Sequence, residues 1–158
     1  MKPTFARGRS LLAAGLAFAA LVTLGVRAFG EGDDPQLKRV AAIKDVMFAM
    51  NADEDSVLGR LKADFAKPKL DDEQWEAAHG RAAMMVEAGN LLLSLKPSMG
   101  ADDAAGLAKW KKHVVDYRGC GEAILDAATK KDRDAGLAAI KSIGGRCTEC
   151  HKDHRKAE

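Results

Sequence analysis

The sequence has little of what builds β-sheets or contacts nucleic acids. Runs of β-branched residues are absent, and the aromatic residues of the 158-residue chain are five Phe, two Trp and one Tyr. Strands are enriched in both kinds of residue, and no segment alternates between apolar and polar side chains as a strand does. No basic patch is interleaved with aromatic residues, so nothing favours binding to nucleic acid.

One long apolar run occurs, and it lies near the N-terminus. Lys2, Arg7 and Arg9 precede about 16 largely apolar residues at 11–26, which is the charge and length pattern of a secretory signal peptide. Residues 26–28 then place small or apolar side chains at the positions that a signal peptidase reads. The pattern predicts export.

We expect cleavage after Ala28, so that residues 1–28 are a signal peptide and residues 29–158 form one periplasmic domain. An uncleaved anchor is the alternative, but about 16 residues are short for a membrane span, and we expect no stable membrane anchor after cleavage. The leader carries four basic and no acidic residues, so the 25 basic and 23 acidic residues of the chain become 21 and 23.

Apolar residues of the mature segment recur three and four positions apart, which predicts four amphipathic helices. A capping box of Asp71 and Gln74 predicts the start of the second helix. We expect the helices at residues 35–61, from Asp71 to about Pro97, from about Asp102 to Ala128, and from about Asp132 to His154.

Four such helices with short links predict an all-α fold, an antiparallel four-helix bundle. A break near residues 51–55 leaves a less regular helical array as the alternative. The small residues Ala82, Gly89 and Gly121 either make room for a flat cofactor or allow ordinary close packing of helices.

The chain carries the run Cys147-Thr148-Glu149-Cys150-His151 near its C-terminus. The C-x-x-C-H spacing is the attachment signature of a c-type haem. Two thiols three residues apart lie on one helix face, where both can form thioether bonds to one macrocycle. The imidazole of His151 is then the proximal iron ligand.

A redox dithiol and half of a zinc site are the alternatives for this run. A redox C-x-x-C accompanies βαβ patterning, which the chain lacks. A structural zinc site needs four ligands, and the remaining candidates do not form a second close pair. These candidates are Cys120, His79, His113 and His154.

The chain resembles the cytochrome c-prime family of four-helix-bundle c-type cytochromes. The family's C-terminal pattern C-x-x-C-H-x-x-aromatic-basic is matched by Cys147, Cys150, His151 and Arg155, with His154 in place of the aromatic residue. Two other segments are similar to the low-spin, methionine-ligated branch: residues 43–47, and Trp75 with residues 87–92.

The resemblance implies one covalent haem c, redox proteins as partners, and Met47 as the distal iron ligand. Members of the family often pair through their first two helices, so a homodimer is a further expectation. Met47 and Met50 both lie on the apolar stripe expected for the first helix, together with Val40 and Ile43. Met50 is therefore the second candidate for the distal ligand, and packing in the core is the alternative for both methionines.

The sixth ligand decides between two functions. With two protein ligands the iron is closed and suited to electron transfer, whereas an open position binds a small gas. We expect an exported single-electron carrier and no enzyme activity; a five-coordinate protein that binds or senses NO or CO is the alternative.

The sequence predicts mainly structural roles for the other polar residues. His154 is expected to complement the helix dipole, His113 to be exposed, and His79 to be partly buried. Cys120 is expected to be an inert buried thiol, or to form an intermolecular disulfide if it is exposed. Arg39 and Lys44 are candidates for pairing with haem propionates, or else are solvated.

Overall fold

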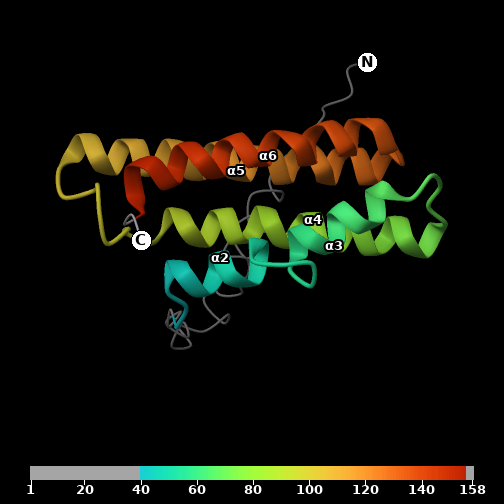
Figure 1. Ribbon diagram of the computed structural model, residues 1–158, viewed down its shortest axis with the longest axis horizontal. Coiled ribbons are helices and arrows are strands. Elements are labelled where there is room, and N and C mark those ends of the chain that lie inside the picture. Colours follow the sequence, from blue (N-terminus) through green and yellow to red (C-terminus); the bar gives the residue numbers. More distant parts are fainter. Residues whose placement is uncertain (1–39, 156–158) are drawn as a thin grey trace, which may run out of the picture. The chain divides into compact units, whose positions relative to one another are not determined.

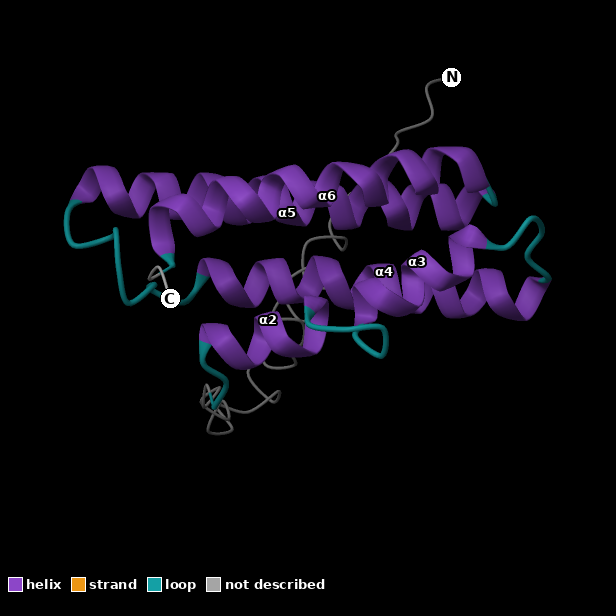
Figure 2. Cartoon of the chain, viewed as in Figure 1, coloured by secondary structure: helices purple, strands orange, loops and turns teal. Residues whose placement is uncertain are grey.

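The computed structural model describes residues 40–155, which form five α-helices and contain no strand (Figures 1 and 2). The predicted all-α class is confirmed. The predicted signal peptide, cleavage after Ala28 and Arg39 lie outside the described residues. Within residues 40–155, no helix combines the length and apolar character needed to cross a membrane. The helices are α2 (Ile43–Asn51), α3 (Val57–Ala66), α4 (Asp72–Leu93), α5 (Ala104–Lys130) and α6 (Arg133–His154).

Aspartate side chains start the three long helices. The predicted capping box at α4 is confirmed: Asp71 accepts a hydrogen bond from the Gln74 N–H at 2.8 Å, and Gln74 Oε1 accepts one from the Asp71 N–H at 3.0 Å. Asp103 caps α5 and Asp132 caps α6 in the same way, each accepting from the N–H three residues on. Such caps satisfy amide groups that have no partner inside the helix.

The break indicated near residues 51–55 of the expected first helix, residues 35–61, is confirmed: the chain turns there and forms two helices, α2 and α3. Asp53 Oδ1 accepts hydrogen bonds from the N–H groups of Asp55 and Ser56, at 3.0 and 2.9 Å. Ser56 Oγ then accepts from the Gly59 N–H at 3.1 Å and caps α3. Short polar side chains that bond to nearby backbone compete with helix continuation in this way.

The two ends of the expected first helix also differ from the observed start of α2 and the observed end of α3. Val40 precedes α2 and is 86% exposed, so its expected place on the apolar stripe is wrong. α3 continues past Leu61 to Ala66, and Lys67 is extended. Proline disfavours the helical conformation in the residue before it, which explains why α3 ends ahead of Pro68.

The helices pack around one core. The most extensive packing joins α4 to α5 and α5 to α6, which lie side by side (Figure 1), while α3 contacts both α4 and α6. α2 packs against α3 and α4. The largest fully buried side chains come from α3, α4, α5 and α6: Leu61, Phe65, Met85, Leu92, Ile124 and Ile143.

Small residues allow these helices to approach closely. Gly121 lies against Met85 of α4, and Gly89 lies against Arg118 of α5, so both serve the packing of α4 on α5. Ala82 is fully buried. Gly136 of α6 lies against the ring of Phe65, and a Cβ at this position would collide with that ring.

The contact between Gly136 and Phe65 yields a stability prediction. Gly136→Ala should lower the free energy of unfolding by about 1–3 kcal/mol, because a methyl group cannot enter this packed interface without displacing a buried ring. Gly144→Ala, in the same helix but with open space at the Cβ position, should raise it by up to about 1 kcal/mol through helix propensity. Urea denaturation followed by circular dichroism measures both, and equal effects would contradict the packing argument.

Candidate haem-attachment site

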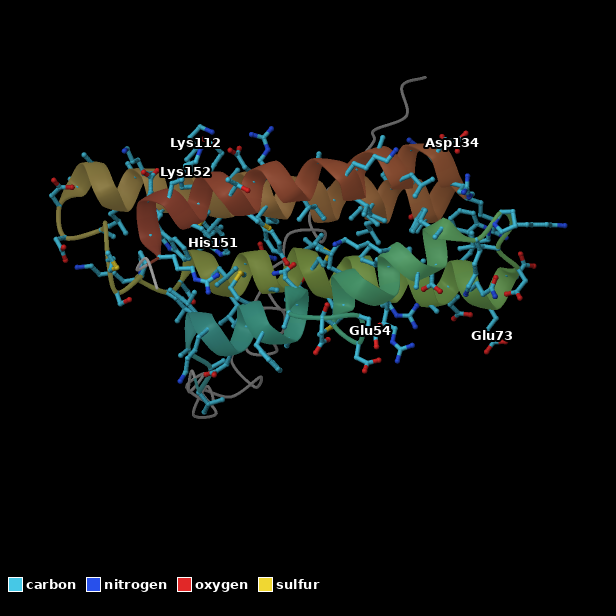
Figure 3. The ribbon with its side chains drawn as sticks, viewed as in Figure 1. Glu54, Glu73, Lys112, Asp134, His151 and Lys152 are labelled. Carbon is cyan, nitrogen blue, oxygen red and sulfur yellow. The ribbon has the colours of Figure 1, made fainter. Side chains whose placement is uncertain are left out.

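The C-x-x-C-H residues lie in the last turns of α6, and their side chains differ in environment. Cys147 and Cys150 are half-buried free thiols that pack against the hydrophobic core. Their spacing of three residues places both on one helix face. His151, labelled in Figure 3, follows directly, and it is an exposed residue. The arrangement presents two sulfur atoms to the interior of the helical array.

Burial weakens both thiols as acids. Desolvation raises the pKa of Cys147, and desolvation together with the charges of Cys147 and Asp153 raises the pKa of Cys150 to about 11. Both thiols are therefore protonated near neutral pH. Redox-active C-x-x-C motifs instead stabilise the thiolate, so this environment does not favour the dithiol alternative.

The zinc alternative for the two cysteines also lacks partners. Within residues 40–155, the three side chains close enough to share a metal ion are His113, Asp153 and His154, and this group contains neither cysteine. A closed zinc site needs four ligands. Cys147 and Cys150 therefore supply no more than half of one.

The imidazole of His151 is held toward its neutral form. Partial desolvation of the ring, and then the positive charge of Arg155, lower its pKa. A neutral imidazole nitrogen is the form that binds a metal. The residue therefore has the protonation state that an axial ligand requires.

Met47 is half-buried on α2 and packs against the same core as the two cysteines. Its Sδ accepts a hydrogen bond from Asn51 Nδ2 at 3.6 Å, and Asn51 Oδ1 accepts one from the Tyr117 hydroxyl at 3.4 Å. Met50 is 7% exposed and belongs to the core. Of the two methionines, Met47 is the one with a polar contact.

Tyr117 connects this methionine to the cysteines. Burial raises the pKa of Tyr117 to about 12, opposed by the hydrogen bond to Asn51 and reinforced by the nearby thiols of Cys147 and Cys120. Met47 and Cys147 thus both lie in the surroundings of one buried tyrosine. The sequence signal that could have revealed the link is Asn51, four residues after Met47 and hence on the same helix face.

Two histidine predictions are wrong. The side chain of His113, expected to be exposed, is only 13% exposed, and its Nε2 lies 3.0 Å from Asp153 Oδ2. His79, expected to be partly buried, is exposed on α4. Periodicity places a residue on a helix face, but the distance to the neighbouring helix decides whether that face is covered.

The remaining candidates are placed as follows. Cys120 is buried, as expected, with Sγ 3.3 Å from Ser142 Oγ. Lys44 is exposed on α2. His154 lies in the last turn of α6 and is partly buried, with Nδ1 3.0 Å from the carbonyl oxygen of Met99.

Comparison of the chain with protein-family models, with curated proteins and with solved structures finds no match. The resemblance to the cytochrome c-prime family therefore rests on the residues and segments described above.

The raised thiol pKa values predict slow alkylation. In chain made without haem attachment, Cys150 should react with iodoacetamide at about pH 8 up to about 100-fold more slowly when folded than in urea, because a pKa near 11 in place of about 9 leaves a hundredth of the thiolate. Peptide mapping by mass spectrometry gives the rate at each cysteine, with circular dichroism confirming the folded state. Equal rates in the folded and unfolded chain would show that the thiol is not desolvated.

Proposed function

We propose that this chain is an exported c-type cytochrome that carries single electrons, with one haem c bound covalently to Cys147 and Cys150. The main support is that both C-x-x-C thiols are half-buried against the core on one face of α6, with His151 directly after them. Redox proteins would be its partners, and the expected signal peptide would direct it to the periplasm.

The donor chemistry of these residues fits a haem. Each thiol would add across one vinyl group, forming a carbon–sulfur bond while the thiol hydrogen passes to the other vinyl carbon, so nothing is released. The bound group supplies an iron that changes oxidation state by one electron. His151 would bind the iron through its neutral imidazole, which its lowered pKa favours.

Met47 is the proposed distal ligand, with Met50 second. The Met47 thioether is half-buried, packs against the same core as Cys147 and Cys150, and lies near Tyr117 through Asn51. A thioether ligand raises the reduction potential relative to a second imidazole. With two protein ligands, no coordination position of the iron would remain open to a small molecule, which suits electron transfer without substrate turnover.

The proposed fold is an antiparallel four-helix bundle in which α2 and α3 together replace the first helix. In support, only Lys131 and Asp132 separate α5 from α6, and the two helices pack together. α3 also packs on both α4 and α6, as the adjacent helix of a bundle would. A homodimer through the first two helices belongs to the same proposal.

One observation favours the gas-binding alternative. Asn51 Nδ2 donates its hydrogen bond to the sulfur of Met47, so ligation by this thioether must compete with that bond. A methionine kept on Asn51 would leave the distal position open for a small gas. Spin state and carbon monoxide binding separate the two functions.

Covalent attachment is tested by mass spectrometry. Mature protein from a host with haem-ligation machinery should carry the added mass of one haem and begin at Phe29. Replacing both Cys147 and Cys150 by Ala should abolish the added mass, because no thiol in the motif remains to form a thioether. Cys120→Ala, which removes the thiol outside the motif, serves as the control. A wild-type protein without the added mass would overturn the proposal.

The distal ligand is tested by spin state. Met47→Ala should convert a low-spin spectrum to high spin and allow immediate binding of carbon monoxide, because it removes the sixth ligand. Met50→Ala should remain low spin while losing about 2–5 kcal/mol of stability as a core truncation. Low-temperature electron paramagnetic resonance measures the spin state, and exposed Met84→Ala is the control. High-spin wild-type protein would favour the gas-binding function.

A further inference from the structure

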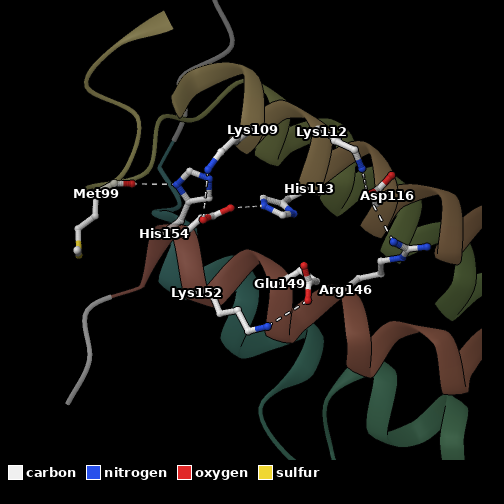
Figure 4. A network of polar contacts seen from close by, with 10 residues as sticks. Met99, Lys109, Lys112, His113, Asp116, Arg146, Glu149, Lys152 and His154 are labelled. Atoms are coloured by element: carbon white, nitrogen blue, oxygen red, sulfur yellow. Dashed lines mark hydrogen bonds and ion pairs between the residues drawn. The ribbon is translucent and has the colours of Figure 1, made fainter. Parts of the chain in front are cut away.

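Three potential metal ligands other than Cys147, Cys150 and His151 lie close together where the C-terminal end of α6 meets α5. His113 Nε2 lies 3.0 Å from Asp153 Oδ2. The ligand atoms of His113, Asp153 and His154 all lie within 4.8 Å of one another. Figure 4 shows the rings of His113 and His154 on either side of a carboxylate.

The two ring nitrogens of His154 differ in their contacts. Its Nδ1 lies 3.0 Å from the carbonyl oxygen of Met99, and because a carbonyl only accepts, Nδ1 carries the hydrogen. Nε2 is the ring nitrogen left for a metal, and it is shielded from solvent and finds no hydrogen-bond partner among the described residues. A metal-bound histidine commonly donates its other ring N–H to a backbone carbonyl in this way.

The surroundings hold His154 in place. Its ring makes edge-on contacts with Trp110 and His113, with centroids 5.6 and 5.7 Å apart. Gly100, with a φ of 67°, lies directly against the backbone of Asp153, where a Cβ would collide. The loop between α4 and α5 therefore fixes the last turn of α6 on one side and α5 fixes it on the other.

We propose that His113 Nε2, the Asp153 carboxylate and His154 Nε2 bind one divalent transition-metal ion of the zinc class. Two imidazoles and a carboxylate are donors that such ions accept, with water completing the coordination. Zinc bonds of about 2.0–2.2 Å place the ligand atoms of a tetrahedral site about 3.4 Å apart. His113 Nε2 and Asp153 Oδ2, at 3.0 Å, are already this close, whereas a pair near the 4.8 Å limit would draw together by about 1 Å. In its contact with Asp153, His113 Nε2 carries the hydrogen, because the carboxylate only accepts. To bind the ion, the ring would release this contact, give up the Nε2 hydrogen to solvent and take one at Nδ1, which leaves the Nε2 lone pair for the metal.

One cation competes at this position. Lys109 Nζ lies 3.7 Å from Asp153 Oδ1, but the lysine side chain is 64% exposed and can turn into solvent. A metal ion would therefore replace Lys109 as the partner of the carboxylate. The competition gives the site a second, independent test, since removing Lys109 removes a repelling charge without removing a ligand.

The test is zinc binding to the full mature chain, measured by isothermal titration and repeated with Cys147 and Cys150 both replaced by Ala, so that their thiols cannot bind the ion. Wild type should bind one equivalent. His154→Ala and Asp153→Asn should each weaken binding at least about 30-fold, because even the loss of a group that only hydrogen-bonds to a metal ligand costs about 10–100-fold in affinity. His79→Ala, at an exposed histidine on α4, should bind as wild type does. Binding that is absent, or insensitive to these two substitutions, would overturn the proposal.

Two further variants test whether Lys109 competes with the ion and whether the ion binds at the C-x-x-C-H motif instead. Lys109→Ala should tighten zinc binding several-fold, because it removes a competing charge; unchanged binding would overturn the competition between Lys109 and the ion for the Asp153 carboxylate. His151→Ala should leave zinc bound, and loss in this variant would move the ion to the C-x-x-C-H motif and overturn the site. We expect the same zinc binding with or without attached haem, so the site stands or falls separately from the proposed function.

Discussion

Burial of one face of α6 is the constraint on which the candidate site depends. Ile140 and Ile143 are buried at 6% and 1% exposure. Steps of four and three residues from Ile143 reach Cys147 and Cys150, so burying the isoleucines turns both thiols inward. His151 is rotated by about 100° from Cys150 around the helix axis, which explains its greater exposure.

α3 makes this burial possible. It contacts both α4 and α6, and Arg133 Nε at the start of α6 donates a hydrogen bond to the carbonyl oxygen of Lys67, at 2.6 Å. On its other side, the buried carboxylate of Asp64 accepts from Arg81 of α4 and from Lys67. A carboxylate removed from water needs such partners. These contacts therefore fix the position of α3 against α4 and α6.

Local features of the chain were predictable from sequence. Asp71, Asp103 and Asp132 cap helices because a cap needs only a side chain and an amide three residues away. The break near residues 51–55 was also predictable, but not the side chain that makes it. In the structure, Asp53 accepts hydrogen bonds from two nearby backbone N–H groups, and these bonds divide the expected helix into two.

Positions that depend on neighbouring helices were not predictable. His113 is covered because the last turn of α6 reaches α5 at its level, and no periodicity within α5 contains that information. His79 lies beyond the covered face of α4 and remains in solvent. The pairing of Asp153 with His113 was missed for the same reason, since 40 residues separate the two partners.

α2 is the least firmly anchored of the helices that bear on the proposed iron site. Val46 and Met50 are its buried residues, while Phe48 is 69% exposed. Two buried apolar side chains contribute about 3–6 kcal/mol to docking, before the entropy of ordering the helix is subtracted.

The position of Met47 therefore depends on a weakly held helix and on the contacts of Asn51. Under the proposed function, ligation by Met47 occurs only when α2 is docked. A bond formed only in the docked state stabilises that state. Iron ligation and the packing of α2 would then reinforce each other, and loss of either would open the distal side.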